Sequence, residues 1–184
     1  MSEQEKKRKK SGRAARIESY VPTAGGGYRY IGKHYLFPEG QRLTYKRYMQ
    51  MRLMLSILSG LAVIGSGLIN SPGMHNTFYV IIPFAGSFIL TVAVLWSLCR
   101  AMYHGVPLKE YVYDATIVRL KALTVVQGVC AVLTAAGETV FLILSAEKQP
   151  LLSLLFAALQ LLAAAAALAH RFISDKFIWE KTEK

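Results

Sequence analysis

Four long apolar stretches constrain this chain more than any other feature. Three of them contain no charged residue, and the other contains one. A helix needs about 20 apolar residues to cross the ~30 Å hydrocarbon layer of a bilayer, because it rises 1.5 Å per residue. Helices of a soluble bundle would carry a polar stripe, which these stretches lack. The sequence therefore predicts an all-α integral membrane protein with four transmembrane helices, at about residues 50–69, 77–99, 122–145 and 150–170.

The distribution of Lys and Arg predicts the orientation of these helices, because both residues are retained on the cytoplasmic side. Of the 22 basic residues, 13 lie in residues 1–52, four in 100–121 and four in 171–184. Only Lys148 lies in a loop expected on the opposite side. We therefore expect two antiparallel helical hairpins with both termini in the cytoplasm, in the plasma membrane of a bacterium.

Composition divides the chain into four parts. Residues 1–27 are rich in charge and poor in apolar side chains, which predicts a disordered cytoplasmic tail that ends in a glycine hinge. Residues 28–48 alternate aromatic with basic side chains, as segments at a membrane interface do, and Gly32 suggests a small hairpin there. Residues 49–171 hold the four-helix membrane domain, and residues 172–184 form a cytoplasmic tail.

The basic tail predicts contact with an anionic inner leaflet. Each cation near such a surface contributes roughly 1 kcal/mol of attraction. Nucleic acid is also negatively charged and would attract the same cations. However, no recognisable binding fold surrounds the basic or aromatic residues, so nucleic acid is not an expected partner. The residues expected at the lipid headgroups are Lys6, Lys7, Arg8, Lys9, Lys10, Arg13 and Arg16.

Glu138 is the one charged residue inside the four apolar stretches. A charged side chain at that depth is costly, so it is the default candidate for a functional group. Three hypotheses stay open: a protonated carboxylic acid bonded to Thr134, Gln160 or a backbone carbonyl, a proton or cation relay, and a partner for a basic residue in another protein's helix. Arg52 lies at the start of the first predicted helix, just before its uncharged part begins at Leu53, and we expect the charged end of Arg52 to reach the membrane surface.

Glu138 belongs to a polar helix face. Gln127, Thr134 and Glu138 follow each other at intervals of seven and four residues, which places them on one side of a helix. Gln160 lies among small residues of the last stretch, and small or polar faces are typical of packed membrane helices. We therefore predict an intramembrane polar seam of these four residues. A shift of 68 residues pairs Ser59 with Gln127, which suggests a tandem repeat, although any two apolar helices resemble each other.

No motif for a catalytic nucleophile, a phosphate loop or a zinc protease is recognisable, so we do not expect an enzyme. The four His residues are never three or four positions apart, so we expect no metal site and no cofactor. The predicted function is a non-catalytic membrane subunit or scaffold that forms homo- or hetero-oligomers with membrane proteins through its small and polar helix faces. The alternative is a small proton- or cation-coupled transporter with Glu138 as its coupling residue.

Overall fold

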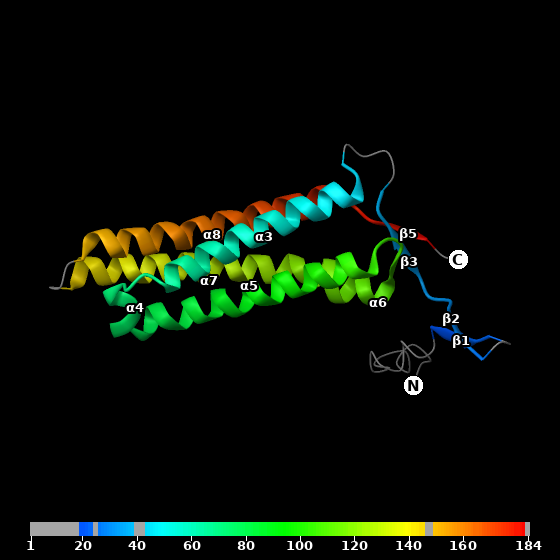
Figure 1. The fold of residues 1–184 in the computed structure, drawn as a ribbon, viewed down its shortest axis with the longest axis horizontal. Coiled ribbons are helices and arrows are strands. Elements are labelled where there is room, and N and C mark those ends of the chain that lie inside the picture. The colour runs from blue at the N-terminus through cyan, green and yellow to red at the C-terminus, as the bar shows by residue number, and fades with distance from the viewer. Residues whose placement is uncertain (1–18, 24–25, 39–42, 146–148, 183–184) are drawn as a thin grey trace, which may run out of the picture.

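The four predicted helices are present, and each is long and apolar enough to cross a membrane. A computed structural model describes residues 19–23, 26–38, 43–145 and 149–182 of the 184-residue chain. The long helices lie side by side in one bundle (Figure 1). They are α3 (Tyr45–Gly67), α5 (Phe78–His104), α7 (Arg119–Leu144) and α8 (Pro150–Lys176).

The helices extend beyond the apolar stretches that predict them. The third continues backward from α7 through a π-helical turn, η1 (Asp114–Val118), into α6 (Glu110–Tyr113), so that it covers 35 residues. The first begins at Tyr45 instead of near residue 50, and the last runs to Lys176. Charged residues do not end these helices, because long charged side chains at a helix end still reach water.

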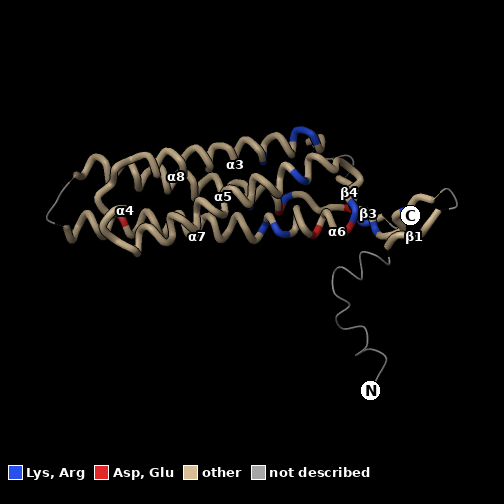
Figure 2. The backbone as a smooth tube through the Cα atoms, turned by 60° about the horizontal axis from the view of Figure 1, so that its bottom comes forward, with Lys and Arg blue, Asp and Glu red and all other residues tan. Residues whose placement is uncertain are grey.

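The helices follow each other around the bundle in the order α3, α5, α7, α8. Both α3 and α7 pack mainly against α5 and α8, so α3 and α7 face each other across the centre. A short helix, α4 (Pro72–Asn76), connects α3 to α5 and also contacts α7. α4 lies against one end of α7 (Figure 2). Gly73 of α4 lies next to the carboxyl group of Glu138 there.

The bundle buries polar as well as apolar side chains and exposes large apolar ones. Its fully enclosed side chains include Arg52, Glu138 and Gln160, each 0% exposed. Many large apolar side chains are exposed on the long helices instead, among them Leu61, Ile82, Ile89, Leu133, Ile143 and Leu161. Soluble monomers rarely expose apolar surface of this extent, whereas lipid covers it at no cost.

Three segments that are far apart in the sequence meet at one end of the bundle. β3 (His34–Leu36) pairs antiparallel with β4 (Leu108–Lys109) on one side and with β5 (Glu180–Thr182) on the other. The N-terminal arm, the connection between α5 and α6 and the C-terminal segment therefore share one end of the molecule (Figure 1). None of these pairings was predicted from the sequence.

A separate hairpin precedes this sheet. β1 (Tyr20–Pro22) pairs with β2 (Tyr28–Tyr30), and the turn between them includes Gly26 at φ +80°, a conformation that glycine adopts without strain. The predicted hairpin at Gly32 is therefore wrong, because the chain turns earlier. Residues 1–27 are also not disordered throughout, since β1 lies within them.

Aromatic side chains fill the space between the three-stranded sheet and the bundle. Phe37 has ring centroids of four other aromatic residues within 5.2 to 5.7 Å, and the rings of Tyr35 and Tyr113 stack at 4.0 Å. Aromatic pairs contribute about 0.5–1.5 kcal/mol beyond the area that they bury. We name this cluster the aromatic cap; it consists of Phe37, Tyr45, Tyr48, Tyr113, Phe177 and Trp179.

Candidate functional site

Polar side chains of α3 face the centre of the bundle and meet polar side chains from the other helices. Ser59 and Ser66 are seven residues apart, so they lie on the same face of α3. None of the residues that meet along this line is more than 4% exposed. We name them the polar column: Arg52, Ser59, Ser66, Ser71, Thr91, Gln127, Glu138, Gln160 and His170.

Glu138 lies at the end of the column next to α4. The Ser71 hydroxyl donates a hydrogen bond to Glu138 Oε1, and the other carboxyl oxygen has no hydrogen-bond partner among the described residues. Gly73 packs directly onto the carboxyl group: a Cβ atom at position 73 would lie 2.8 Å from Glu138 Cδ. Glu138 therefore holds the α3–α5 connector against α7.

Thr134 and Gln160 do not bind Glu138, although both were candidate partners. Thr134 donates its hydroxyl hydrogen to the Cys130 carbonyl of its own helix, at 2.8 Å. Gln160 Nε2 donates to Ser66 Oγ at 2.5 Å, and Gln160 Oε1 has no partner among the described residues. Both side chains are buried in the bundle as the seam predicts, but the seam is divided into separate contacts.

Gln127 connects the helices near the middle of the column. Its Nε2 donates to Ser59 Oγ of α3 at 2.9 Å and to Thr91 Oγ1 of α5 at 2.6 Å. Ser59 Oγ in turn donates to the Ala163 carbonyl of α8 at 3.3 Å. The Gln127 amide therefore links α7 to α3 and α5, and the Ser59 hydroxyl extends this contact to α8. The pairing of Ser59 with Gln127 agrees with the 68-residue shift, whereas Ser66 meets Gln160 instead of Thr134.

We expect Gln127→Leu to lower the free energy of unfolding by about 1–2 kcal/mol, because interhelical hydrogen bonds in membranes contribute ~0.6 kcal/mol on average, with a maximum of ~1.7. Titration with SDS in mixed micelles measures this loss. Gln160→Leu is the matched control, since it removes one bond together with an acceptor that has no partner, and it should cost less. Equal losses for the two variants would contradict the bridging role of Gln127.

Arg52 lies at the other end of the column, beneath the aromatic cap. Its Nη1 donates to the Tyr48 hydroxyl at 2.8 Å, and its Nε donates to His170 Nε2 at 3.2 Å. The guanidinium carbon also lies 5.2 Å from the centre of the Tyr48 ring. Arg52 Nη2 and His170 Nδ1 have no partner among the described residues. The expectation that Arg52 reaches the membrane surface is therefore wrong; the cap encloses it, and two polar side chains accept its hydrogen bonds.

An apolar layer interrupts the column. Its buried residues are small or β-branched and lie one helical turn from Gln127 on α7 and from Gln160 on α8, and Phe84 packs against them. The members of the layer are Ala62, Val63, Ala131, Ala163 and Ala164. The polar side chains therefore form separate clusters around Glu138, Gln160, Gln127 and Arg52, and the described hydrogen bonds do not join them into one chain.

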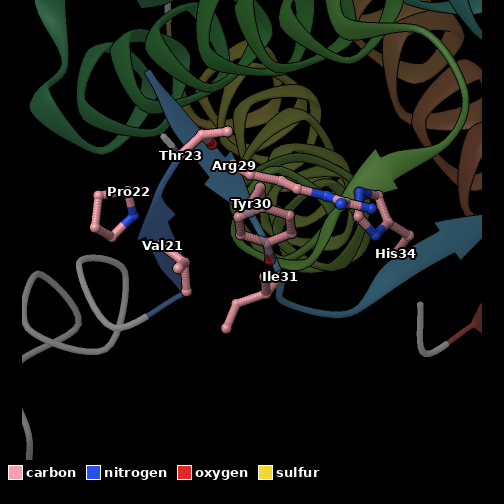
Figure 3. A pocket seen from close by; sticks show the side chains of 7 residues that line it. All are labelled: Val21, Pro22, Thr23, Arg29, Tyr30, Ile31 and His34. Carbon is pink, nitrogen blue, oxygen red and sulfur yellow. The ribbon is translucent and has the colours of Figure 1, made fainter. Parts of the chain in front are cut away.

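A cavity of about 600 Å³ lies outside the bundle, beside the β1–β2 hairpin. Figure 3 shows that the side chain of Arg29 extends toward the ring of His34 at one edge of this cavity. Tyr30 and Ile31 also line it. Burial raises the pKa of Tyr30, so its hydroxyl stays protonated at neutral pH. The cavity therefore combines the positive charge of Arg29 with an aromatic and aliphatic wall.

The expected headgroup contacts between Lys6 and Arg16 lie outside the described residues. Within the described ranges, no group of three or more His, Cys, Asp and Glu side chains is arranged to hold a metal ion. Ser71, Thr91 and His170 were not predicted as members of the column. The spacing of Ser59 and Ser66 indicates which face of α3 is polar, but no local sequence signal indicates which residues of the other helices meet that face.

Four helices that are long and apolar enough to cross a membrane suggest a multi-pass membrane protein. No family model, curated protein or solved structure matches the chain.

Proposed function

We propose that this protein is a non-catalytic membrane subunit or scaffold in a plasma membrane, with its basic end in the cytoplasm. In this proposal α3 pairs with α5 and α7 pairs with α8 as two hairpins, and both chain ends lie on the cytoplasmic side. Basic residues gather at the end of the bundle that carries the strands (Figure 2). The positive-inside rule supports this orientation.

The observation that carries the proposal is the division of the polar column into separate clusters. A relay of protons or ions needs a connected path of polar groups, and an apolar layer lies between the Gln127 cluster and the Gln160 cluster. Each cluster instead holds neighbouring elements together, as the contacts of Gln127 with α3 and α5 do. This arrangement supports a structural role for the polar residues.

The assembly surface in this proposal is not the seam, because the chain's own helices cover it. The strand end offers a surface of different character, with a cation beside two half-buried aromatic rings and one exposed aromatic ring nearby in the sequence. Tyr28 is 75% exposed, and Lys109 Nζ lies within 5.3 to 5.4 Å of the Tyr20 and Tyr30 ring centres. A partner with an acidic surface fits these residues.

A photoreactive amino acid at position 28 tests this surface in native membranes. We expect a discrete cross-linked partner at Tyr28, and none at Leu151, which is equally exposed at the far end of the bundle. Arg29→Glu should weaken the cross-link through charge repulsion, whereas Arg119→Glu on α7 should leave it unchanged. Cross-linking that is equally strong at both positions would contradict a docking surface at the strand end.

A proton- or cation-coupled transporter remains the second candidate, because Glu138 Oε2 and Gln160 Oε1 are buried acceptors without partners among the described residues. Glu138→Gln distinguishes the two functions, since glutamine keeps the hydrogen bond to Ser71 but cannot exchange a proton. We expect no change in pH-driven flux into liposomes that contain the purified protein. If the wild type carries such a flux and Glu138→Gln abolishes it, the transporter proposal replaces the scaffold.

A further inference from the structure

A groove of about 450 Å³ lies on the outer face of α5, toward the basic end of the bundle. Its lining residues are Trp96, Cys99, Arg100 and Tyr103, which follow each other at the i, i+3, i+4 and i+7 positions of one helix face. Trp96 is 72% exposed and Tyr103 is 87% exposed. Two large aromatic rings therefore border a hollow that the rest of the bundle does not fill.

The groove combines apolar walls with one positive charge. Arg100 is the only charged residue among the described residues that line the groove, and none of the ion pairs between described residues involves Arg100. Two other cations at this end of the bundle do form ion pairs. Lys121 Nζ lies 3.1 Å from Asp175 Oδ1, and Arg171 Nε lies 2.9 Å from Asp175 Oδ2. The charge of Arg100 is therefore available to a ligand.

The depth of the groove fits a lipid headgroup region. Trp and Tyr are enriched where the hydrocarbon layer meets water, and basic side chains at the same level reach the phosphates. Figure 2 shows that Lys and Arg gather along this end of the bundle. The apolar surface of α5 continues along the helix from Trp96 toward the middle of its length, through exposed residues such as Val92 and Ile89.

We propose that this groove binds an anionic glycerophospholipid, an inference that rests on the membrane location proposed above. The phosphate group lies against the Arg100 guanidinium, since both carry formal charge and several hydrogen-bonding atoms. One acyl chain lies along Trp96 and Cys99 toward Val92, and Tyr103 borders the headgroup. A zwitterionic lipid fills the same apolar walls but offers no net negative charge to Arg100.

Trp96 reports on its own site. The chain has two Trp residues, and the other, Trp179, is 8% exposed within the aromatic cap. In a Trp179→Phe background, Trp96 fluorescence is measured in vesicles of phosphatidylcholine that contain brominated phosphatidylglycerol or brominated phosphatidylcholine at equal mole fractions. We expect the anionic lipid to bind about five-fold more tightly, as one near-surface charge provides.

Arg100→Gln should lower this ratio to about one, and Arg119→Gln should leave it near five-fold, because Arg119 is exposed at the same end but does not line the groove. A ratio of one in the parent, or a ratio that Arg100→Gln does not change, overturns the proposal. Quenching by neither lipid contradicts the membrane location instead. Trp96→Phe is the control for an indirect effect on the aromatic cap. In this variant the fluorescence of the remaining Trp179 should not change with Arg100→Gln.

Discussion

Replacing His170 with Leu is expected to lower the free energy of unfolding by about 2–3 kcal/mol, which is the cost of leaving a hydrogen-bonding atom of a buried charged group without its partner. In the folded protein, His170 Nε2 accepts the hydrogen bond from Arg52 Nε at 3.2 Å. Both side chains are at most 2% exposed, so water does not replace the lost acceptor. Leucine has a similar volume, which limits the effect of packing.

Arg52→Met should cost far less, within about 1 kcal/mol of the wild type, although it removes the larger group. Replacing a buried charge by an apolar side chain of similar length removes the charge together with its desolvation penalty. The Arg52 guanidinium also has a nitrogen, Nη2, without a partner among the described residues, so its two hydrogen bonds compensate the desolvation of the charge only in part.

The double variant separates these effects. In an Arg52→Met background, His170→Leu no longer strands a charge and should lower the free energy of unfolding by less than about 1 kcal/mol. Titration with SDS in mixed micelles measures all three variants, and fluorescence of the buried Trp179 reports whether the aromatic cap stays folded. If the two substitutions were simply additive, Arg52 and His170 would not interact as the distance between them indicates.

The existence of four membrane-length helices and the inward face of α7 were predictable from the sequence, because both depend on local properties. An uncharged stretch long enough to cross a bilayer is visible without knowledge of its neighbours. The period of 3.6 residues placed Gln127, Thr134 and Glu138 on one face, and all three are buried in the bundle. A helix hides its polar face from lipid whichever helix covers that face.

The partners within the bundle were not predictable in the same way. Glu138 binds Ser71 because α4 folds back toward α7, and a short turn sequence does not specify that path. Arg52 was expected at the membrane surface because a long basic side chain next to an apolar stretch usually extends there. Its inward orientation depends on Tyr48 one turn earlier and on His170, which is 118 residues away.

The three-stranded sheet escaped prediction for a related reason. Its strands contain two or three residues each, too few for an alternating pattern to stand out. They are stabilised by the aromatic cap, whose members come from widely separated parts of the chain. Charge counting placed these segments on one side of the membrane, and the sheet places them at one end of the bundle.

The second large effect concerns Gly73, where the addition of a single methyl group should lower the free energy of unfolding by about 2–3 kcal/mol. A Cβ atom at this position would lie 2.8 Å from Glu138 Cδ and 3.1 Å from Oε1, so Gly73→Ala must displace the carboxyl group. Overpacking of a filled interior costs typically 1–3 kcal/mol, and the displaced group also loses its hydrogen bond from Ser71. SDS titration of the purified protein measures the loss.

Removal of the carboxyl group should reverse the sign of this effect. In a Glu138→Ala background the methyl group that Gly73→Ala adds enters space that the carboxyl group had filled. Alanine also favours a helix over glycine by about 0.5–1 kcal/mol, so Gly73→Ala becomes neutral or stabilising. Gly65→Ala in α3 is the control: its added Cβ would meet Leu159 Cδ1 at an ordinary 3.6 Å, and it should be tolerated in either background. A Gly73→Ala penalty that persists without Glu138 would mean that the connector is not held by this carboxyl group.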